Sequence, residues 1–263
     1  MLNWFFSNQL YLGIAQAVVT IILALAVMLI ARWQEIKLER EIIVALLRGI
    51  LQIVAVGSVL VLLLQGPNWT SVLVLAAMMV AAATIAARRA RGIPGAFRVS
   101  LYGISLGAGA VIVLMTWLGV IDSAISSLVP VGSMLIANSM NTNALALDRF
   151  RGEVESHVGQ VEAALALGAS PSITVRPYVR AAVTASLIPR VDNLRSLGIV
   201  WIPGLMAGMV LAGTDPVYAA IYQFVVIAMI FAASGLTSLI STVLIRSQVF
   251  SKAEQLVLRP TNE

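Results

Sequence analysis

Polar and sulfur-containing residues stand in an otherwise apolar stretch of the sequence, Val129–Leu147. Asn138 and Asn141 follow Met134 at positions i+4 and i+7, so a helix would place all three on one face, with Met140 interleaved. That face offers a thioether and two amide carbonyls, which can line a path for a cation. Asparagines packed between membrane helices explain the same pattern, so both interpretations stay open.

A second group of candidates surrounds the dipeptide Pro203-Gly204, which weakens a helix by removing a backbone donor and adding flexibility. Broken helices near the membrane midplane often form transport sites. Met206 and Met209 follow the break, and Asp215 can attract a departing cation. Close packing through G-x-x-x-G and capping of a helix by Asp215 are the alternatives. The predicted substrate path comprises Met134, Asn138, Met140, Asn141, Pro203, Met206, Met209 and Asp215.

Residue types alone exclude several kinds of chemistry. The chain has no cysteine, which excludes disulfides, thiolate metal sites and cysteine nucleophiles. Neither of its two lysines, Lys37 and Lys252, belongs to a G-x-x-x-x-G-K-[ST] phosphate loop. We therefore expect no catalytic residue and no cofactor bound by this chain, and we assign no metal ligand. ATP with its Mg²⁺ would bind to a partner chain.

The composition is typical of a membrane protein. Of the 263 residues 60% are hydrophobic and 11% are charged, whereas a soluble domain carries about 25% charged residues. A membrane-spanning helix needs about 20 mostly apolar residues, and seven segments meet this loosely. They are Leu10–Ala31, Ile42–Leu64, Ser71–Ala87, Val99–Leu118, Val129–Leu147, Ser196–Ala212 and Val217–Ile245. We therefore predict an all-α, polytopic membrane protein that forms one permease domain over residues 1–263. We interpret Gly103 and Gly107, four residues apart, as a helix-packing pair.

The positive charges predict the orientation of the spans. With these seven spans, all of the 17 lysines and arginines except Arg48 fall on one side, and the opposite side holds only Asp122 and Asp215. Cytoplasmic loops collect lysine and arginine, so we expect the N-terminus outside and the C-terminus in the cytoplasm. Arg48, inside the second span, can extend its head group to the interface. The polar segment Arg32–Glu41 predicts an interfacial elbow helix on the membrane surface.

The longest predicted extramembrane segment is the cytoplasmic loop Asp148–Arg195. Apolar residues repeat there at helical spacing, at Val154, Val158, Val161 and Leu165. This repeat predicts an amphipathic helix, on which we expect the single histidine, His157, to be solvated. A further helix over Ser172–Leu187, kinked by Pro177, is expected to follow. Such helical order indicates a loop that docks a partner.

Part of this loop resembles the E-A-A-x-x-x-G element of ABC-importer permeases, a short helix that inserts into a cleft of the ATPase. The matching residues are Glu162, Ala163, Ala164, Gly168 and Ala169. Small residues allow close approach, and the glycine permits a sharp exit from the helix. The rest of the importer pattern does not continue, because its isoleucine and Leu-Pro positions hold Tyr178, Arg180 and Ala181. The resemblance implies that this element couples the chain to an ATPase.

A second resemblance covers nearly the whole chain. It is carried by the runs Leu187-Ile188-Pro189-Arg190-Val191-Asp192, Ile202-Pro203-Gly204-Leu205-Met206-Ala207-Gly208, Ala212-Gly213-Thr214-Asp215-Pro216 and Pro130-x-x-x-Met134-x-x-x-Asn138-x-Met140. These runs resemble the FetB permease family, bacterial membrane subunits of an iron-exporting ABC transporter that pair with a separate ATPase, FetA. Plant relatives are linked to aluminium tolerance. The resemblance implies a permease in the bacterial inner membrane that exports iron or a related metal ion.

The general ABC plan of two permeases and two ATPases implies a homodimer of this chain together with a FetA-like ATPase, and no nucleic-acid partner. An ATPase-independent channel or secondary carrier is one alternative; its usual coupling groups are intramembrane acids, and the seven predicted spans contain no Asp or Glu. A non-transporting membrane scaffold is another alternative, although a scaffold would need no polar path.

Overall fold

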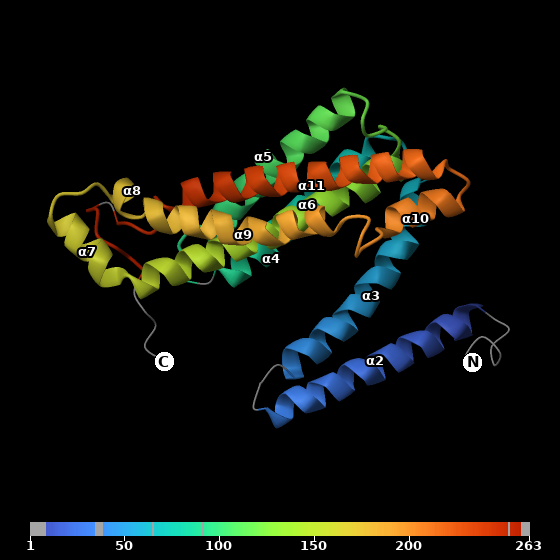
Figure 1. Ribbon diagram of the computed structural model, residues 1–263, viewed down its shortest axis with the longest axis horizontal. Helices are drawn as coiled ribbons and strands as arrows, with labels where there is room; N and C mark the ends of the chain where they lie inside the picture. The colour runs from blue at the N-terminus through green and yellow to red at the C-terminus, as the bar shows by residue number, and fades with distance from the viewer. Residues whose placement is uncertain (1–8, 35–38, 65, 91, 252, 259–263) are drawn as a thin grey trace. The chain divides into compact units, whose positions relative to one another are not determined.

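The computed structural model describes residues 9–34, 39–64, 66–90, 92–251 and 253–258 (Figure 1). The described residues are mostly helical and contain no strand, only two isolated β-bridges, Leu197 with Trp201 and Phe250 with Leu256. The all-α prediction is therefore confirmed. Contacts divide the chain into two compact units, Met1–Gly66 and Pro67–Glu263.

The first unit is a pair of apolar helices. They are α2 (Gln9–Trp33) and α3 (Glu39–Leu64), which match the first two predicted spans. Most described side chains of α2 are exposed, Leu23 at 66%, as suits a helix surrounded by lipid. The centre of the predicted elbow helix, residues 35–38, lies outside the described residues, and its ends belong to α2 and α3. Arg48 is exposed on α3.

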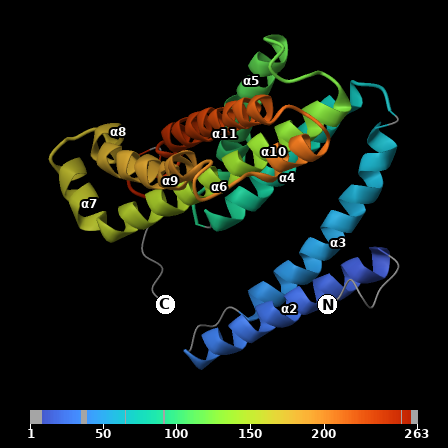
Figure 2. The same cartoon turned by 45° about the vertical axis from the view of Figure 1, so that its right-hand side comes forward.

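The second unit is a helical bundle (Figures 1 and 2). Its long helices are α4 (Thr70–Arg89), α5 (Ala96–Trp117), α6 (Ile125–Ser156), α9 (Arg176–Ser196) and α11 (Pro216–Ile245). Helix α11 packs against α5, α6 and α9, and α6 also packs against α4. Among the described residues, α2, α4, α5 and α11 are long and apolar enough to cross a membrane. The chain is therefore a multi-pass membrane protein.

Helices α5 and α11 pack closely because two glycines face α11. A Cβ atom built at Gly107 would lie 2.5 Å from the backbone nitrogen of Thr237, and one at Gly103 would lie 1.8 Å from Ser241 Oγ. Real Cβ atoms do not approach other heavy atoms so closely, so a larger residue at Gly107 would require a helix to move, and one at Gly103 would require the Ser241 hydroxyl to move. The interpretation of Gly103 and Gly107 as a packing pair is confirmed.

The prediction of one helix over Ser196–Ala212 is wrong. Helix α9 ends at Ser196, a non-helical segment follows, and α10 (Gly204–Leu211) has only 8 residues. Gly198 adopts a left-handed φ of 78°, and Pro203 is extended with ψ of 143°. Proline also lacks the N–H that a continuing helix needs. In Figures 1 and 2 α9 and α10 follow one another along α11, which runs in the opposite direction, so the two helices together take the place of the predicted sixth span, which we call the sixth crossing.

The predicted loop Asp148–Arg195 is correspondingly shorter, because α9 belongs to the bundle. Helix α6 continues to Ser156, and α7 (Val158–Ala166) and α8 (Pro171–Thr174) follow at the end of the bundle where α11 finishes (Figure 1). Pro177 does not kink a helix as predicted, since it lies in the first turn of α9, where a missing N–H is tolerated. Val154 and Val161 are buried, but the predicted amphipathic helix is interrupted at His157.

Candidate functional site

A cavity of about 280 Å³ lies between α6, α9, α11 and the turn that follows α9. Its apolar wall comes mainly from α11, and its polar wall comes from α6 and α9. The lining residues are Met134, Asn138, Arg190, Asn193, Trp201, Ile227, Ile230 and Phe231. Met134 and Asn138 are thus brought together in a cavity, and α9 and the turn after it add three residues that the substrate-path prediction did not include.

Asn138 holds α6 and α9 together within this cavity. Its Nδ2 donates a hydrogen bond to the carbonyl oxygen of Met134, one turn earlier, over 2.8 Å. Its Oδ1 accepts a hydrogen bond from Nη1 of Arg190. The amide oxygen of Asn138, which was predicted to line a path for a cation, therefore already accepts a hydrogen bond from the guanidinium of Arg190.

Arg190 reaches Asn138 because it continues the packed face of α9. Ala182 and Ser186, which precede it at helical spacing, are both buried. Ser186 Oγ lies 2.9 Å from Ser238 Oγ of α11. This hydrogen bond sets the position of α9 along the axis of α11. The charge count placed Arg190 in a cytoplasmic loop. The structure corrects this, since Arg190 lies beside Asn138 of the fifth predicted span.

No carboxylate neutralises Arg190 in the described part of this unit. Helices α4, α5, α10 and α11 contain no Asp or Glu, and α6 has none before Asp148. The acid closest in sequence, Asp192, is exposed and lies 3.7 Å from Nη1 of Arg195. Nε of Arg190 is buried and has no hydrogen-bond partner among the described residues. A charge of this kind inside a membrane protein marks a functional path or a water-filled cavity.

Buried polar atoms without a partner also gather elsewhere in the bundle. They belong to Ser100 of α5, Ser139, Thr142 and Asn143 of α6, and Ser234, Thr237 and Ser241 of α11. Polar groups in the apolar part of a membrane need partners, and no described residue supplies a hydrogen-bond partner to these atoms. The sequence analysis weighed amides and missed these hydroxyls, although their three- and four-residue spacing in α11 was a visible signal.

The other predicted path residues of α6 lie outside the cavity lining. Met140 packs against the main apolar core cluster. Asn141 is exposed within its unit. The i, i+4, i+7 face is therefore present on α6, but only Met134 and Asn138 of that face line the cavity.

The predicted residues around α10 also lie outside the cavity lining. Pro203 is buried at the N-terminus of α10, the backbone N–H of Met206 donates to Oε1 of Gln223 over 3.2 Å, and Met209 is half-buried. Asp215 Oδ1 accepts hydrogen bonds from the backbone N–H groups of Val217 and Tyr218, each at 2.9 Å. The structure thus gives Asp215 a capping role at the start of α11.

The predicted coupling residues form α7 and its exit turn. Glu162 and Ala163 are exposed, whereas Ala164 and Ala169 are half-buried. Gly168 has a φ of 86°, its N–H donates to the carbonyl of Leu165, and that of Ala169 donates to the carbonyl of Ala164. These two bonds end a helix in a turn that favours glycine.

Two contacts hold the opposite end of α7, at the break that follows α6. His157 Nδ1 lies 2.8 Å from the carbonyl oxygen of Glu153, and its ring stacks on Tyr178 of α9 with centroids 5.1 Å apart. His157 remains partly solvated, with 37% of its side chain exposed, and its ring also links the α6–α7 break to α9. A hollow of about 640 Å³ lies between α7 and the C-terminal segment Ala253–Leu256, and Glu162 and Gly168 line it.

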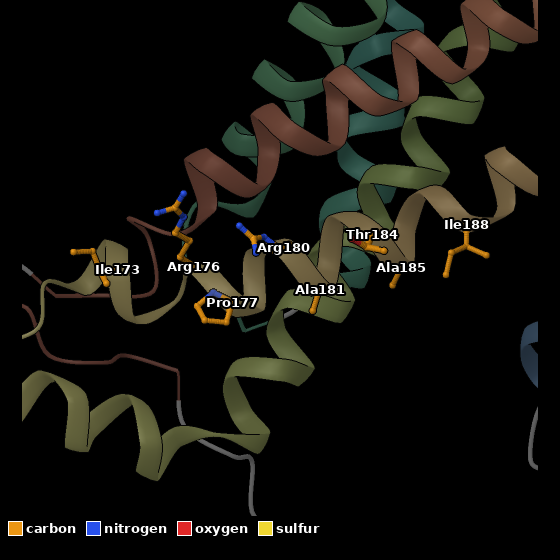
Figure 3. A pocket seen from close by; sticks show the side chains of 8 residues that line it. All are labelled: Ile173, Arg176, Pro177, Arg180, Ala181, Thr184, Ala185 and Ile188. Carbon is orange, nitrogen blue, oxygen red and sulfur yellow. The ribbon is translucent and has the colours of Figure 1, made fainter.

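The opposite face of α9 forms another hollow, of about 730 Å³ (Figure 3). Its lining residues are Ile173, Arg176, Pro177, Arg180, Ala181, Thr184, Ala185 and Ile188. Helical geometry places Thr184 and Ile188 about half a turn around α9 from Ala182 and Ser186. Helix α9 thus has a packed face that ends in Arg190 and an outer face with two arginines at one end.

Comparison with known proteins gives consistent matches along the chain. The family described as "Uncharacterised protein family (UPF0014)" matches residues 14–250. A UPF0014 membrane protein of Synechocystis is 34% identical over 242 residues, which is 89% of this chain and 92% of the relative. The Arabidopsis thaliana protein ALUMINUM SENSITIVE 3 is 30% identical over 264 residues, 97% of this chain and 96% of the relative.

The Escherichia coli protein named "Probable iron export permease protein FetB" is 29% identical over 239 residues, which is 90% of this chain and 92% of the relative. No solved structure matches the chain significantly. The family match extends over both units of the structure and over the helices that form the cavity. The chain therefore belongs to the UPF0014 family of membrane proteins.

Proposed function

We propose that this chain is the membrane-spanning permease of an ABC-type transporter that exports iron or a related metal ion. The observation that carries this function is the likeness to the E. coli protein whose name describes iron export, over 90% of the chain. The structure supports it with a polar cavity inside an apolar bundle. Active export needs an energy source, and the chain has no phosphate loop, so the proposal includes a separate ATPase.

A FetA-like ATPase, binding ATP-Mg, docks on α7 and its exit turn in this proposal. Glu162 and Ala163 are exposed there, and nothing lies within 4 Å of a Cβ built at Gly168, so a partner can approach the turn. Arg88 and Arg89 end α4, and Arg246 follows α11, so we place this end of the bundle in the cytoplasm. Two copies of this chain in the bacterial inner membrane complete the transporter.

Export is tested by reconstituting the chain with its ATPase in proteoliposomes and measuring ATP-dependent movement of iron. We expect Asn138→Leu to keep assembly and ATP hydrolysis but lose transport, because it removes the acceptor of Arg190. Unchanged iron transport by this variant would reduce Asn138 to a packing residue. A wild-type complex that hydrolyses ATP and moves no metal would contradict the proposed function itself.

Docking is tested with a matched pair of variants at Gly168. Asparagine tolerates a positive φ, so Gly168→Asn keeps the turn, whereas Gly168→Trp adds bulk at the surface that the ATPase approaches. If the turn is a binding hot spot, Gly168→Trp loses about 2 kcal/mol of binding, which is roughly thirtyfold. Pull-down of the ATPase and its stimulated hydrolysis measure this loss. Equal binding by Gly168→Trp and wild type would place the coupling surface elsewhere.

Orientation is tested by labelling introduced cysteines, since the chain has none of its own. Asn68 lies just before α4, and Ser247 lies just after α11, so Asn68→Cys and Ser247→Cys report on opposite ends of predicted spans. In intact cells an impermeant thiol reagent is expected to label Asn68→Cys and to leave Ser247→Cys unlabelled. The reverse labelling would reverse the proposed orientation.

A further inference from the structure

The electrostatics of the cavity are opposite to those of a cation site. Its one charged lining residue is Arg190, and none of its lining residues is acidic. A guanidinium stays protonated in proteins, so a bare metal ion in this cavity would meet a positive charge. Among the residues that the structure describes, no group of three or more His, Asp or Glu side chains could hold a metal ion.

The hydrogen-bonding groups around the cavity are mainly donors. The Oδ1 atom of Asn138, an acceptor, is already bound by Nη1 of Arg190. Of two other polar lining residues, Trp201 carries only an N–H donor in its side chain, and Asn193 carries an amide with two N–H donors and one acceptor oxygen. Hard metal ions need oxygen ligands, whereas a cavity rich in donors suits a ligand rich in acceptors.

Arg190 has hydrogen-bonding capacity beyond its bond to Asn138. Nη1 donates to Asn138, whereas Nε is buried and has no hydrogen-bond partner among the described residues. A carboxylate or a phosphate can accept two parallel hydrogen bonds from the edge of a guanidinium formed by Nε and Nη2, and an oxyanion that binds this edge requires the Arg190 side chain to turn Nε towards the cavity. The volume of about 280 Å³ is just below the roughly 300–1,000 Å³ of most small-molecule sites, so it suits a small oxyanion group.

We propose that this cavity binds a carboxylate or phosphate group on Arg190, and that the exported metal passes as an anionic chelate and not as a bare cation. The second statement rests on the proposed function, whereas the first stands on the cavity alone. The oxyanion belongs to a soluble ligand or to the phosphate of a lipid head group, and the two sources share the chemistry that Arg190 recognises.

The purified chain in nanodiscs of zwitterionic phosphatidylcholine tests the site, with citrate and inorganic phosphate as calorimetric probes. We expect at least one probe to bind the wild type and to bind Arg190→Gln about tenfold more weakly or worse, because a charge-assisted bond is lost. Arg190→Lys keeps the positive charge but loses the planar guanidinium that donates two parallel hydrogen bonds, so we expect probe affinity between those of wild type and Arg190→Gln. The matched control is Arg195→Gln, an exposed arginine on the same helix, which is expected to bind like the wild type.

A second set of nanodiscs, containing anionic phosphatidylglycerol, distinguishes the sources. Displacement of the soluble probe by this lipid, or binding of the lipid alone that depends on Arg190, assigns the site to a head group and supports an oxyanion site. If a soluble probe binds and the lipid does not displace it, the site is assigned to a soluble, transported ligand. Equal probe binding by wild type and Arg190→Gln, or no Arg190-dependent binding of probe or lipid, overturns the site.

Proteoliposomes that contain the ATPase separate this inference from the proposed function. Iron offered as ferric citrate is expected to move, and Arg190→Gln is expected to slow it about tenfold or more. Transport of Fe²⁺ that is equal in wild type and Arg190→Gln overturns the anionic chelate. If neither form of iron moves while citrate still binds through Arg190, the proposed metal export fails and the oxyanion site stands.

Discussion

Two helix interfaces within the bundle are built on opposite plans. Between α5 and α11 the backbones touch, so that a single Cβ at Gly107 would lie 2.5 Å from a backbone nitrogen. Helices α6 and α9 also pack together, but beside a cavity of about 280 Å³ they are joined by the hydrogen bond between the Arg190 and Asn138 side chains. A backbone contact cannot adjust, whereas a side-chain contact across a cavity can change its rotamers.

This difference indicates where the bundle is rigid and where it can rearrange. Helices α5 and α11 act as one fixed pair. Helix α9 is attached to α6 by polar side chains, and it ends at the non-helical segment 197–203 that breaks the sixth crossing. Hinges in transporters are a few residues at the ends of elements, and this segment has that position. Substitutions on the two sides are therefore expected to act differently, one on folding and the other on transport.

The largest effect is expected for Gly107→Ala. Its new Cβ meets backbone atoms of Thr237 at 2.5 and 2.7 Å, so a helix would have to move. Overpacking of this kind costs about 3 kcal/mol of stability or more. Thermal unfolding in detergent measures it, with Gly109→Ala as the control on the same helix, because its Cβ meets only the end of the Met79 side chain at 3.4 Å. Equal unfolding temperatures for the two variants would show that the α5–α11 interface is not more tightly packed at Gly107 than at Gly109.

A smaller and reparable effect is expected for Gly103→Ala. Here the closest atom is Ser241 Oγ at 1.8 Å, which belongs to a side chain, whereas the carbonyl oxygen of Thr237 is 3.3 Å away. Adding Ser241→Ala removes that hydroxyl, and we expect the double variant to recover part of the lost stability. The coupling energy of the double-mutant cycle, of about 1 kcal/mol or more, is the measurement. Additive effects would show that the two residues do not meet.

Across the cavity, Arg190→Gln is expected to preserve folding and change transport. The variant removes a charge that lacks a carboxylate partner, so its unfolding temperature is expected to stay near that of the wild type. Transport by the ATPase complex is expected to fall about tenfold or more, the loss of one charge-assisted hydrogen bond. A large loss of stability with normal transport in the surviving fraction would make Arg190 a structural residue and erase the contrast with α5–α11.

The smallest effect is expected for Gly208→Ala on α10. Nothing lies within 4 Å of a Cβ built there, so this glycine packs against no described residue of its own chain. Replacing it in a helix is expected to be neutral or to stabilise by about 0.5–1 kcal/mol. Thermal unfolding checks this value. A destabilisation as large as that of Gly107→Ala would mean that a partner covers this face of α10.

The sequence predicted correctly those elements whose structure depends only on the composition of one helix. The apolar runs that became α2, α4, α5 and α11 needed no knowledge of their neighbours, and the spacing of Gly103 and Gly107 already indicated a packing face. Reasoning failed at the sixth crossing, because Ile199–Ile202 is as apolar as a helix yet lies in a non-helical segment. Hydropathy measures solvent preference, not backbone conformation.

The lining of the cavity overlaps the predicted substrate path only in part, for a related reason. Met134 and Asn138 share a helix face and could be paired from their spacing alone. Arg190 lies 52 residues from its partner Asn138, and counting charges assigned it to a loop because charges are rare inside spans. The buried stripe of Ala182 and Ser186 that leads to Arg190 was visible in the sequence but carries meaning only once α9 is known to belong to the bundle.

The break in the sixth crossing has a consequence for biogenesis. A helix of 8 residues rises about 12 Å, less than half of the roughly 30 Å hydrocarbon core. The translocon therefore cannot retain α10 as an independent anchor while the ribosome is still completing the chain. Stable insertion therefore needs the end of α9 and the helix α11, whose start is fixed by the Asp215 cap and which packs against both α9 and α10, so we expect α9, α10 and α11 to partition into lipid together.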